Sequence, residues 1–262
     1  MRYALPTCTV LALLISAPVM AEEAAADASP HTFTANVGLF SQYIFRGISQ
    51  TNEDPALQGG FDYAHSSGFY IGTWASNISW LRDSYTDGTD GFGYRSSSLE
   101  VDIYAGFANE IGDTGIGYDV GLLQYLYPGS KGGTPTADTL EAYGALSYGW
   151  LTAKYSYALS DEVFQVTKAD GSYYAELNLQ VPLGETGVTA GAHYGHQKFE
   201  GPSGFSYNDY KLSLAYDLGK LGSKLEGTEA GLMYTKHTAG NVFVRSIFGS
   251  EDQFTGYIKR TF

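Results

Sequence analysis

The chain has 262 residues, enough for one large β domain or two small ones, and 28 Asp and Glu against 15 Lys and Arg give it a formal net charge of −13. This acidity argues against a nucleic-acid partner, because phosphates call for a basic surface. The 22 Tyr and 33 Gly, with only 8 Pro, are typical of a barrel of short strands with small inward residues and aromatic girdles. They are also compatible with a soluble β-sandwich.

The first residues predict a removed secretory signal over residues 1–21. Arg2 supplies a positive start, Val10 to Ala17 an apolar stretch, and Ala21 closes a small-residue cleavage site. An N-terminal membrane anchor is the alternative, but the stretch is shorter than the ~20 residues that a spanning helix needs. Cleavage removes Arg2 and Cys8, so the mature chain has no cysteine and a formal charge of 14 − 28 = −14.

Residues 22–31 are rich in Ala and acidic side chains and predict a flexible periplasmic lead-in. From residue 32 the pattern has a period of two, and residues 32–262 are expected to form the barrel. In the clearest strand, Leu99 to Phe107, apolar residues alternate with polar or small ones such as Glu100 and Asp102. About twelve strands are expected, near 33–46, 56–65, 69–78, 98–108, 115–127, 139–148, 150–160, 172–181, 187–196, 208–218, 227–236 and 252–262.

The connections support an antiparallel barrel over a sandwich. Outer-membrane barrels alternate long extracellular loops with short periplasmic turns, and their strand number is even. The second, fourth, sixth and eighth links are short here, whereas links such as Trp80 to Ser97 are long and polar. The tenth, Gly219 to Glu226, is longer than this rule expects. The chain ends on Phe262, the kind of terminal aromatic residue that such barrels present to their insertion machinery.

Residues 36–78 resemble a known family. The segments Ser41-Gln42-Tyr43-Ile44-Phe45-Arg46-Gly47-Ile48-Ser49-Gln50, Pro55 to Tyr63 and Gly68 to Ile78 carry the resemblance. They are similar to the TorF-like porin family, exported proteobacterial proteins of unknown function. The resemblance implies an outer-membrane barrel with a presumed pore, and it supplies no substrate, cofactor or catalytic residue.

Charged residues on the polar faces of the strands are the candidate pore-lining side chains. Arg46 is expected at the upper end of the first strand, either as a cation near the pore mouth or as a structural ion pair that anchors a loop. Acidic residues prevail on the polar faces, which predicts a mild cation preference if the lumen is open; alternatively these charges pair across strands and plug it. The predicted pore-lining residues are Arg46, Glu100, Asp102, Asp119, Glu141, Lys154, Glu176, Lys211, Asp217 and Glu229.

Neither a metal site nor a catalytic site is expected. His193 and His196 are three residues apart on a predicted strand, so they should point to opposite faces. No serine stands in a motif that would suggest a Ser-His-carboxylate enzyme, and no cofactor is predicted.

The sequence therefore predicts a transmembrane, all-β antiparallel barrel in a Gram-negative outer membrane, with lipid and small polar solutes as its partners. Passive diffusion through a polar lumen is the expected function. A non-conducting structural or adhesion barrel, an outer-membrane enzyme and a soluble periplasmic β protein remain as alternatives.

Overall fold

The computed structural model describes residues 29–85, 93–132, 134–201, 205–240 and 250–262. The predicted signal segment 1–21 and most of the predicted lead-in, residues 22–28, lie outside the described residues. Among the described residues, no helix is both long enough and apolar enough to cross a membrane.

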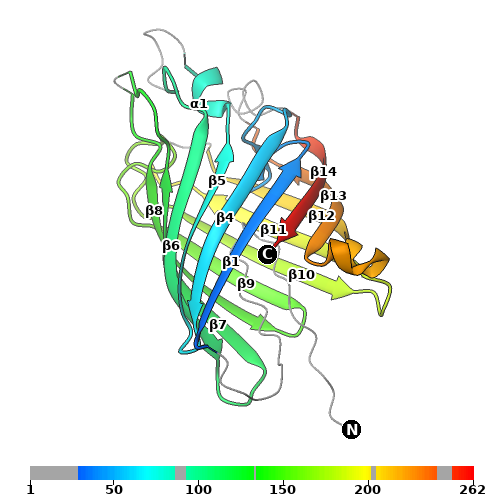
Figure 1. The fold of residues 1–262 in the computed structure, drawn as a ribbon. Coiled ribbons are helices and arrows are strands. Elements are labelled where there is room, and N and C mark those ends of the chain that lie inside the picture. The colour runs from blue at the N-terminus through cyan, green and yellow to red at the C-terminus, as the bar shows by residue number, and fades with distance from the viewer. Residues whose placement is uncertain (1–28, 86–92, 133, 202–204, 241–249) are drawn as a thin grey trace.

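Within the described residues, twelve strands form one closed antiparallel barrel (Figure 1). Each strand pairs with its neighbours in chain order. The strands are β1 (His31–Phe40), β4 (Ala56–His65), β5 (Phe69–Asn77), β6 (Leu99–Glu110), β7 (Ile116–Leu126), β8 (Thr139–Tyr148), β9 (Leu151–Ala158), β10 (Tyr173–Pro182), β11 (Val188–Lys198), β12 (Tyr207–Asp217), β13 (Thr228–His237) and β14 (Asp252–Thr261). The predicted all-β barrel of about twelve strands is confirmed.

The barrel closes where its first strand meets its last. Five residue pairs, from Asn36 with Thr261 to Phe40 with Tyr257, join β1 to β14. On its other side β1 pairs with β4 over ten residues. Figure 1 shows β1 in blue beside β14 in red. We call this β1–β14 contact the seam.

The connections alternate in length, as predicted, except that the tenth (218–227) is longer than the ninth (199–206). Short ones, such as 66–68 and 111–115, lie at the barrel end where β1 begins and β14 finishes, which we call the short-turn end. The opposite, long-loop end carries the other connections, including the helix α1 (Trp80–Asp83). The tenth connection, at the short-turn end, contains two 3-10 helices, η1 (Leu218–Leu221) and η2 (Ser223–Leu225).

Eleven of the predicted strands match their observed bounds within two residues. The prediction for the first strand, residues 33–46, is wrong at its end, because β1 stops at Phe40. The chain then turns into the barrel and forms a small hairpin of β2 (Ile44–Phe45) and β3 (Ile48–Ser49). Arg46 therefore lies on an inward-folded loop and not on the barrel wall.

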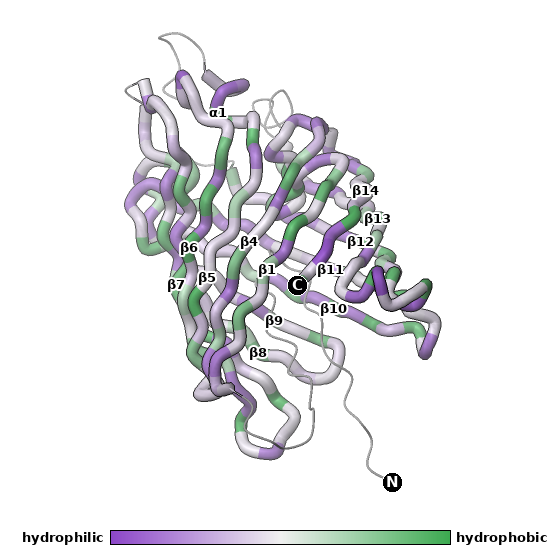
Figure 2. The backbone as a smooth tube through the Cα atoms, viewed as in Figure 1, coloured by the Kyte–Doolittle hydropathy of each residue, from purple (hydrophilic) through white to green (hydrophobic). Residues whose placement is uncertain are grey.

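The two faces of the wall have opposite polarity, because side chains alternate along each strand. On β6 the outward Ile103 is 47% exposed, whereas the inward Glu100 and Asp102 are buried. Outward Leu212 and Leu232 are 61% and 69% exposed. Figure 2 shows the alternation as green and purple stretches along the strands. An apolar belt thus surrounds an interior of charged and polar groups and buried aromatic rings. Such a belt is what a bilayer requires of a barrel.

Candidate functional site

The loop between β1 and β4, residues 41–55, is the main feature of the interior; we call it the inner loop. Its hairpin turns at Arg46 and Gly47, whose φ angles are +45° and +79°. Positive φ at both central residues is the signature of a tight two-residue hairpin turn. Glycine adopts this conformation readily, whereas arginine does so at a cost.

Contacts of the Arg46 side chain hold the tip of the inner loop. Its Nη2 donates to both carboxylate oxygens of Glu141 on β8, at 2.9 and 2.7 Å, and its Nη1 donates to Gln197 Oε1 on β11 at 2.7 Å. The guanidinium also stacks on Tyr174 of β10, 4.3 Å from the ring centroid. The Arg46 and Glu141 side chains are each only 2% exposed. Arg46 thus forms the structural ion pair that was one of its two predicted roles.

The neighbours of Arg46 extend the inner loop to both sides of the barrel. Tyr43 donates to Glu100 Oε1 on β6 at 2.7 Å, and burial raises the pKa of the Tyr43 phenol well above its ordinary value, so the phenol remains a donor. On the far side, a Cβ added at Gly47 would lie 2.5 Å from Asp209 Cβ on β12. Ile48 packs beside Tyr207 of the same strand. The inner loop therefore reaches across the lumen and contacts opposite walls.

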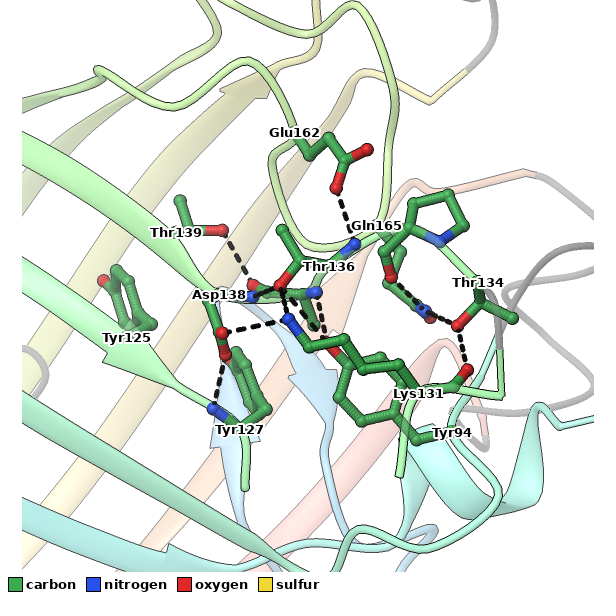
Figure 3. Close-up of polar contacts among 12 residues, drawn as sticks. Tyr94, Tyr125, Tyr127, Lys131, Thr134, Thr136, Asp138, Thr139, Glu162 and Gln165 are labelled. Carbon is green, nitrogen blue, oxygen red and sulfur yellow. Dashed lines mark hydrogen bonds and ion pairs between the residues drawn. The ribbon is translucent and has the colours of Figure 1, made fainter. Parts of the chain in front are cut away.

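Other long connections form a hydrogen-bonded layer at the same end of the barrel (Figure 3). The buried Gln165, from the β9–β10 connection, accepts from Gly93 N and donates to Thr134 Oγ1. Glu162 accepts from Thr136 N at 2.6 Å, and Tyr94 OH accepts from Ala137 N at 2.7 Å. Three connections far apart in sequence thus hold one another in place at the long-loop end.

The predicted pore-lining residues fall into three groups. Four of them are buried on the wall near the inner loop: Glu100, Asp102, Glu141 and Glu176. Four others are on the inner face but partly exposed to solvent: Asp119, Lys154, Lys211 and Glu229. Asp217 is exposed at the end of β12, where it accepts from Gly219 N at 2.8 Å and caps η1. That these side chains line a conducting pore stays a prediction.

Sequence reasoning missed the interior role of Asp62 and Asp209. Each continues the inward parity of its strand, so the alternation around Phe61 and around Tyr210 carried the signal. It also missed a recurring contact in which a tyrosine hydroxyl donates to an interior carboxylate. These pairs are Tyr43–Glu100, Tyr70–Asp119, Tyr104–Asp62, Tyr125–Glu141, Tyr174–Asp209 and Tyr257–Glu229.

The two histidines considered for a metal site point apart. His193 lies inside the barrel, where its ring nitrogens contact Asn178 Oδ1 at 2.7 Å and Asp209 Oδ1 at 2.9 Å. His196 contacts Asn208 Oδ1 and lies beside the ring of Tyr173. In the described part of the chain, no three His, Cys, Asp or Glu side chains are grouped so that they could hold a metal ion.

Comparison with known proteins gives a family and a fold. A protein-family model described as "Bacterial protein of unknown function (Gcw_chp)" matches residues 24–262. Among solved structures, a KdgM porin superposes with a TM-score of 0.54 at 8% identity, over 87% of this chain and 99% of that one. A KdgM porin in complex with disordered oligogalacturonate gives a TM-score of 0.53, with the same identity and coverage. No curated protein matches the sequence. At such low identity the structural likeness supports a porin-like fold and no more.

Proposed function

The chain belongs to the Gcw_chp family, a bacterial family of unknown function, and from this premise we propose that it is an outer-membrane channel for passive diffusion of small polar solutes or ions. In this proposal the short-turn end faces the periplasm, after signal cleavage near Ala21. The inner loop is the constriction of the channel. Insertion machinery would recognise the strand that ends at Phe262.

The observation that carries the proposal is the partly exposed charge inside the short-turn half of the barrel. Asp119 and Lys154 lie on the inner face yet keep contact with solvent. Lys154 Nζ lies 4.3 Å from the centroid of the Tyr143 ring, so the wall itself holds this cation. Charged side chains that stay solvent-exposed inside a barrel with an apolar outer belt are the expected lining of an aqueous path.

The charge balance of the interior indicates which solutes would pass. Among the described residues, interior carboxylates outnumber interior cations. The carboxylates are Asp62, Glu100, Asp102, Asp119, Glu141, Glu176, Asp209 and Glu229, and the cations are Arg46, Lys154, Lys211 and Lys259. Such an interior favours cations and neutral polar molecules. It disfavours polyanions such as the oligogalacturonate of the KdgM complex, so the likeness in fold carries no substrate to this chain.

A second candidate is a non-conducting structural or adhesion barrel. The burial of the inner loop favours it, because Tyr43, Phe45, Arg46 and Ile48 are all less than 9% exposed inside the wall. A loop packed this tightly would block the lumen unless it moves or leaves a path beside it. The porin-like barrel favours a channel over an enzyme. Among the described residues, His193 contacts Asn178, Asp209, Tyr174 and Glu176, none of which is a serine nucleophile.

Single-channel recording of the refolded protein in planar bilayers tests the proposal. We expect discrete conductance steps and, in a salt gradient, a reversal potential that shows cation preference. Asp119→Asn should weaken that preference and Lys154→Gln should strengthen it, because both side chains are partly exposed. Glu100→Gln with Asp102→Asn should have less effect, since Tyr43 covers this buried pair.

The variants of opposite sign are matched controls for each other. Equal reversal potentials in Asp119→Asn and Lys154→Gln would contradict an ion path along this wall. An inserted barrel without conductance would refute the channel and support the non-conducting candidate.

A further inference from the structure

The connection between β12 and β13, residues 218–227, is folded although it lies at the short-turn end. Asp217 caps η1, and backbone hydrogen bonds join Gly222 N to Gly219 O at 3.1 Å and Leu225 N to Gly222 O at 3.0 Å. A simple turn between antiparallel strands needs only two to five residues. The extra residues therefore build a defined structure of their own.

This connection exposes leucines where water would disfavour them. Leu221 is 66% exposed and Leu225 is 37% exposed, and the neighbouring β10–β11 turn adds Leu183 at 44%. The two connections touch, since a Cβ added at Gly187 would meet Lys220 Cγ at 2.7 Å. In Figure 1 the orange helices of this connection project to the side of the barrel. We call the three exposed leucines of these adjacent connections, Leu183, Leu221 and Leu225, the rim patch.

The rim patch continues the apolar belt of the barrel. Outward Leu212 and Leu214 on β12 and Leu232 on β13 are 56% to 69% exposed, and the connection follows directly from these two strands. Lys220 and Lys224, both exposed, stand beside the rim leucines. Leucine next to lysine at the edge of an apolar belt is the pattern of an element that lies in the headgroup region of a membrane.

We propose that the η1–η2 connection is an interfacial anchor that binds the phospholipid leaflet at the short-turn end of the barrel. Its leucines enter the boundary between headgroups and acyl chains, and its lysines contact lipid phosphates. The anchor fixes the depth of the barrel on the β10–β13 side. This inference rests on the proposed insertion of the barrel in a membrane.

Depth measurement with single-cysteine labels tests the anchor. Because Cys8 lies in the predicted signal, residues 22–262 contain no cysteine and each new cysteine is the only label site. Leu221→Cys probes the anchor, Leu232→Cys the belt, and Asp113→Cys the exposed β6–β7 turn at the same end. Each variant carries an environment-sensitive fluorophore and is refolded into phosphatidylcholine vesicles that contain phosphatidylglycerol. Doxyl-labelled lipids then quench it at headgroup or tail depth.

We expect the Leu221 label to be quenched more strongly at headgroup depth than at tail depth, the Leu232 label to show the reverse order, and the Asp113 label to stay unquenched. A Leu221 label that behaves like the Asp113 label, while the Leu232 label is quenched, would overturn the anchor alone. A Leu221 label that is shifted to the blue but unquenched would indicate a contact with a second copy of the chain and would also overturn it. Labels unquenched at both leucines would refute membrane insertion and the proposed function.

Discussion

Replacing Arg46 with alanine is expected to release the tip of the inner loop. The change removes two hydrogen bonds to Glu141, one to Gln197 and a stacking contact with Tyr174, all of them buried. Truncating one member of a buried ion pair costs ~3–5 kcal/mol, because the other charge remains without its partner. If undocking the inner loop costs less free energy than leaving Glu141 buried without its partner, the loop will leave its site. The loss of stability then equals the free energy of undocking.

A double-mutant cycle gives the magnitude. Free energies of unfolding in urea, followed by tryptophan fluorescence, are compared for wild type, Arg46→Ala, Glu141→Ala and the double variant. The double variant should regain part of the loss, since it leaves no buried charge alone. Arg46→Asn serves as the control for the turn, because asparagine tolerates the positive φ of this position but cannot replace the ion pair.

Conductance gives the second readout. A released loop should widen the path and raise single-channel conductance in Arg46→Ala and in Arg46→Asn alike. A coupling below about 1 kcal/mol, the value of exposed ion pairs, together with unchanged conductance would refute the role of Arg46 as the contact that holds the loop.

Three further predictions concern the turn, the belt and the interior. Gly47→Ala should destabilise the docked loop, since its φ is +79° and the added carbon would clash with the opposite wall. Gly112→Ala is the control, because Gly112 also has a positive φ but has open space around it. Equal urea midpoints for the two variants would contradict this packing. Leu232→Arg should cost ~2–4 kcal/mol, the range for a charge deep in the lipid-facing belt, and refolding yield into vesicles would show it; a neutral result would place this face away from lipid. Tyr43→Phe removes one of the two tyrosine hydroxyls that bond Glu100, the other being that of Tyr127, at a cost of ~1–3 kcal/mol. A urea midpoint equal to that of wild type would argue against the buried contact.

The alternation of side chains made the barrel wall predictable from the sequence. A strand with lipid on one side and polar surroundings on the other must alternate, so runs such as Leu99 to Phe107 predict both the strand and its faces. The same parity correctly placed Glu100 and Asp102 inside. It holds equally for Asp62 and Asp209, which a stricter use of parity would have included.

The inner loop was not predictable in this way. Tyr43 to Phe45 are aromatic and β-branched residues, the types enriched in strands, so with Arg46 they resemble a continuation of β1. In the structure Phe45 and Arg46, neighbours of opposite parity, are both buried, because the loop has the barrel wall on every side. Periodicity of apolar residues in a sequence identifies an element with one apolar and one polar face. It gives no information on a segment that the barrel wall surrounds on all sides. The Arg46-Gly47 turn was a local signal for a reversal of the chain, yet nothing in it indicates the inward direction.

The seam has a consequence for how this barrel assembles. Its five residue pairs join strands at opposite ends of the chain, whereas consecutive strands pair over seven residues or more. Consecutive hairpins need only short loops to close, but the seam must bring residues 36–40 to residues 257–261 and therefore bears the largest loss of chain entropy. Closure should consequently be the last step of assembly, after the whole sheet has formed. Once closed, the seam is extended at both ends by backbone hydrogen bonds, between Ala35 and Phe262 and from Ser41 N to Gly256 O, so the last residues of the chain fasten the wall.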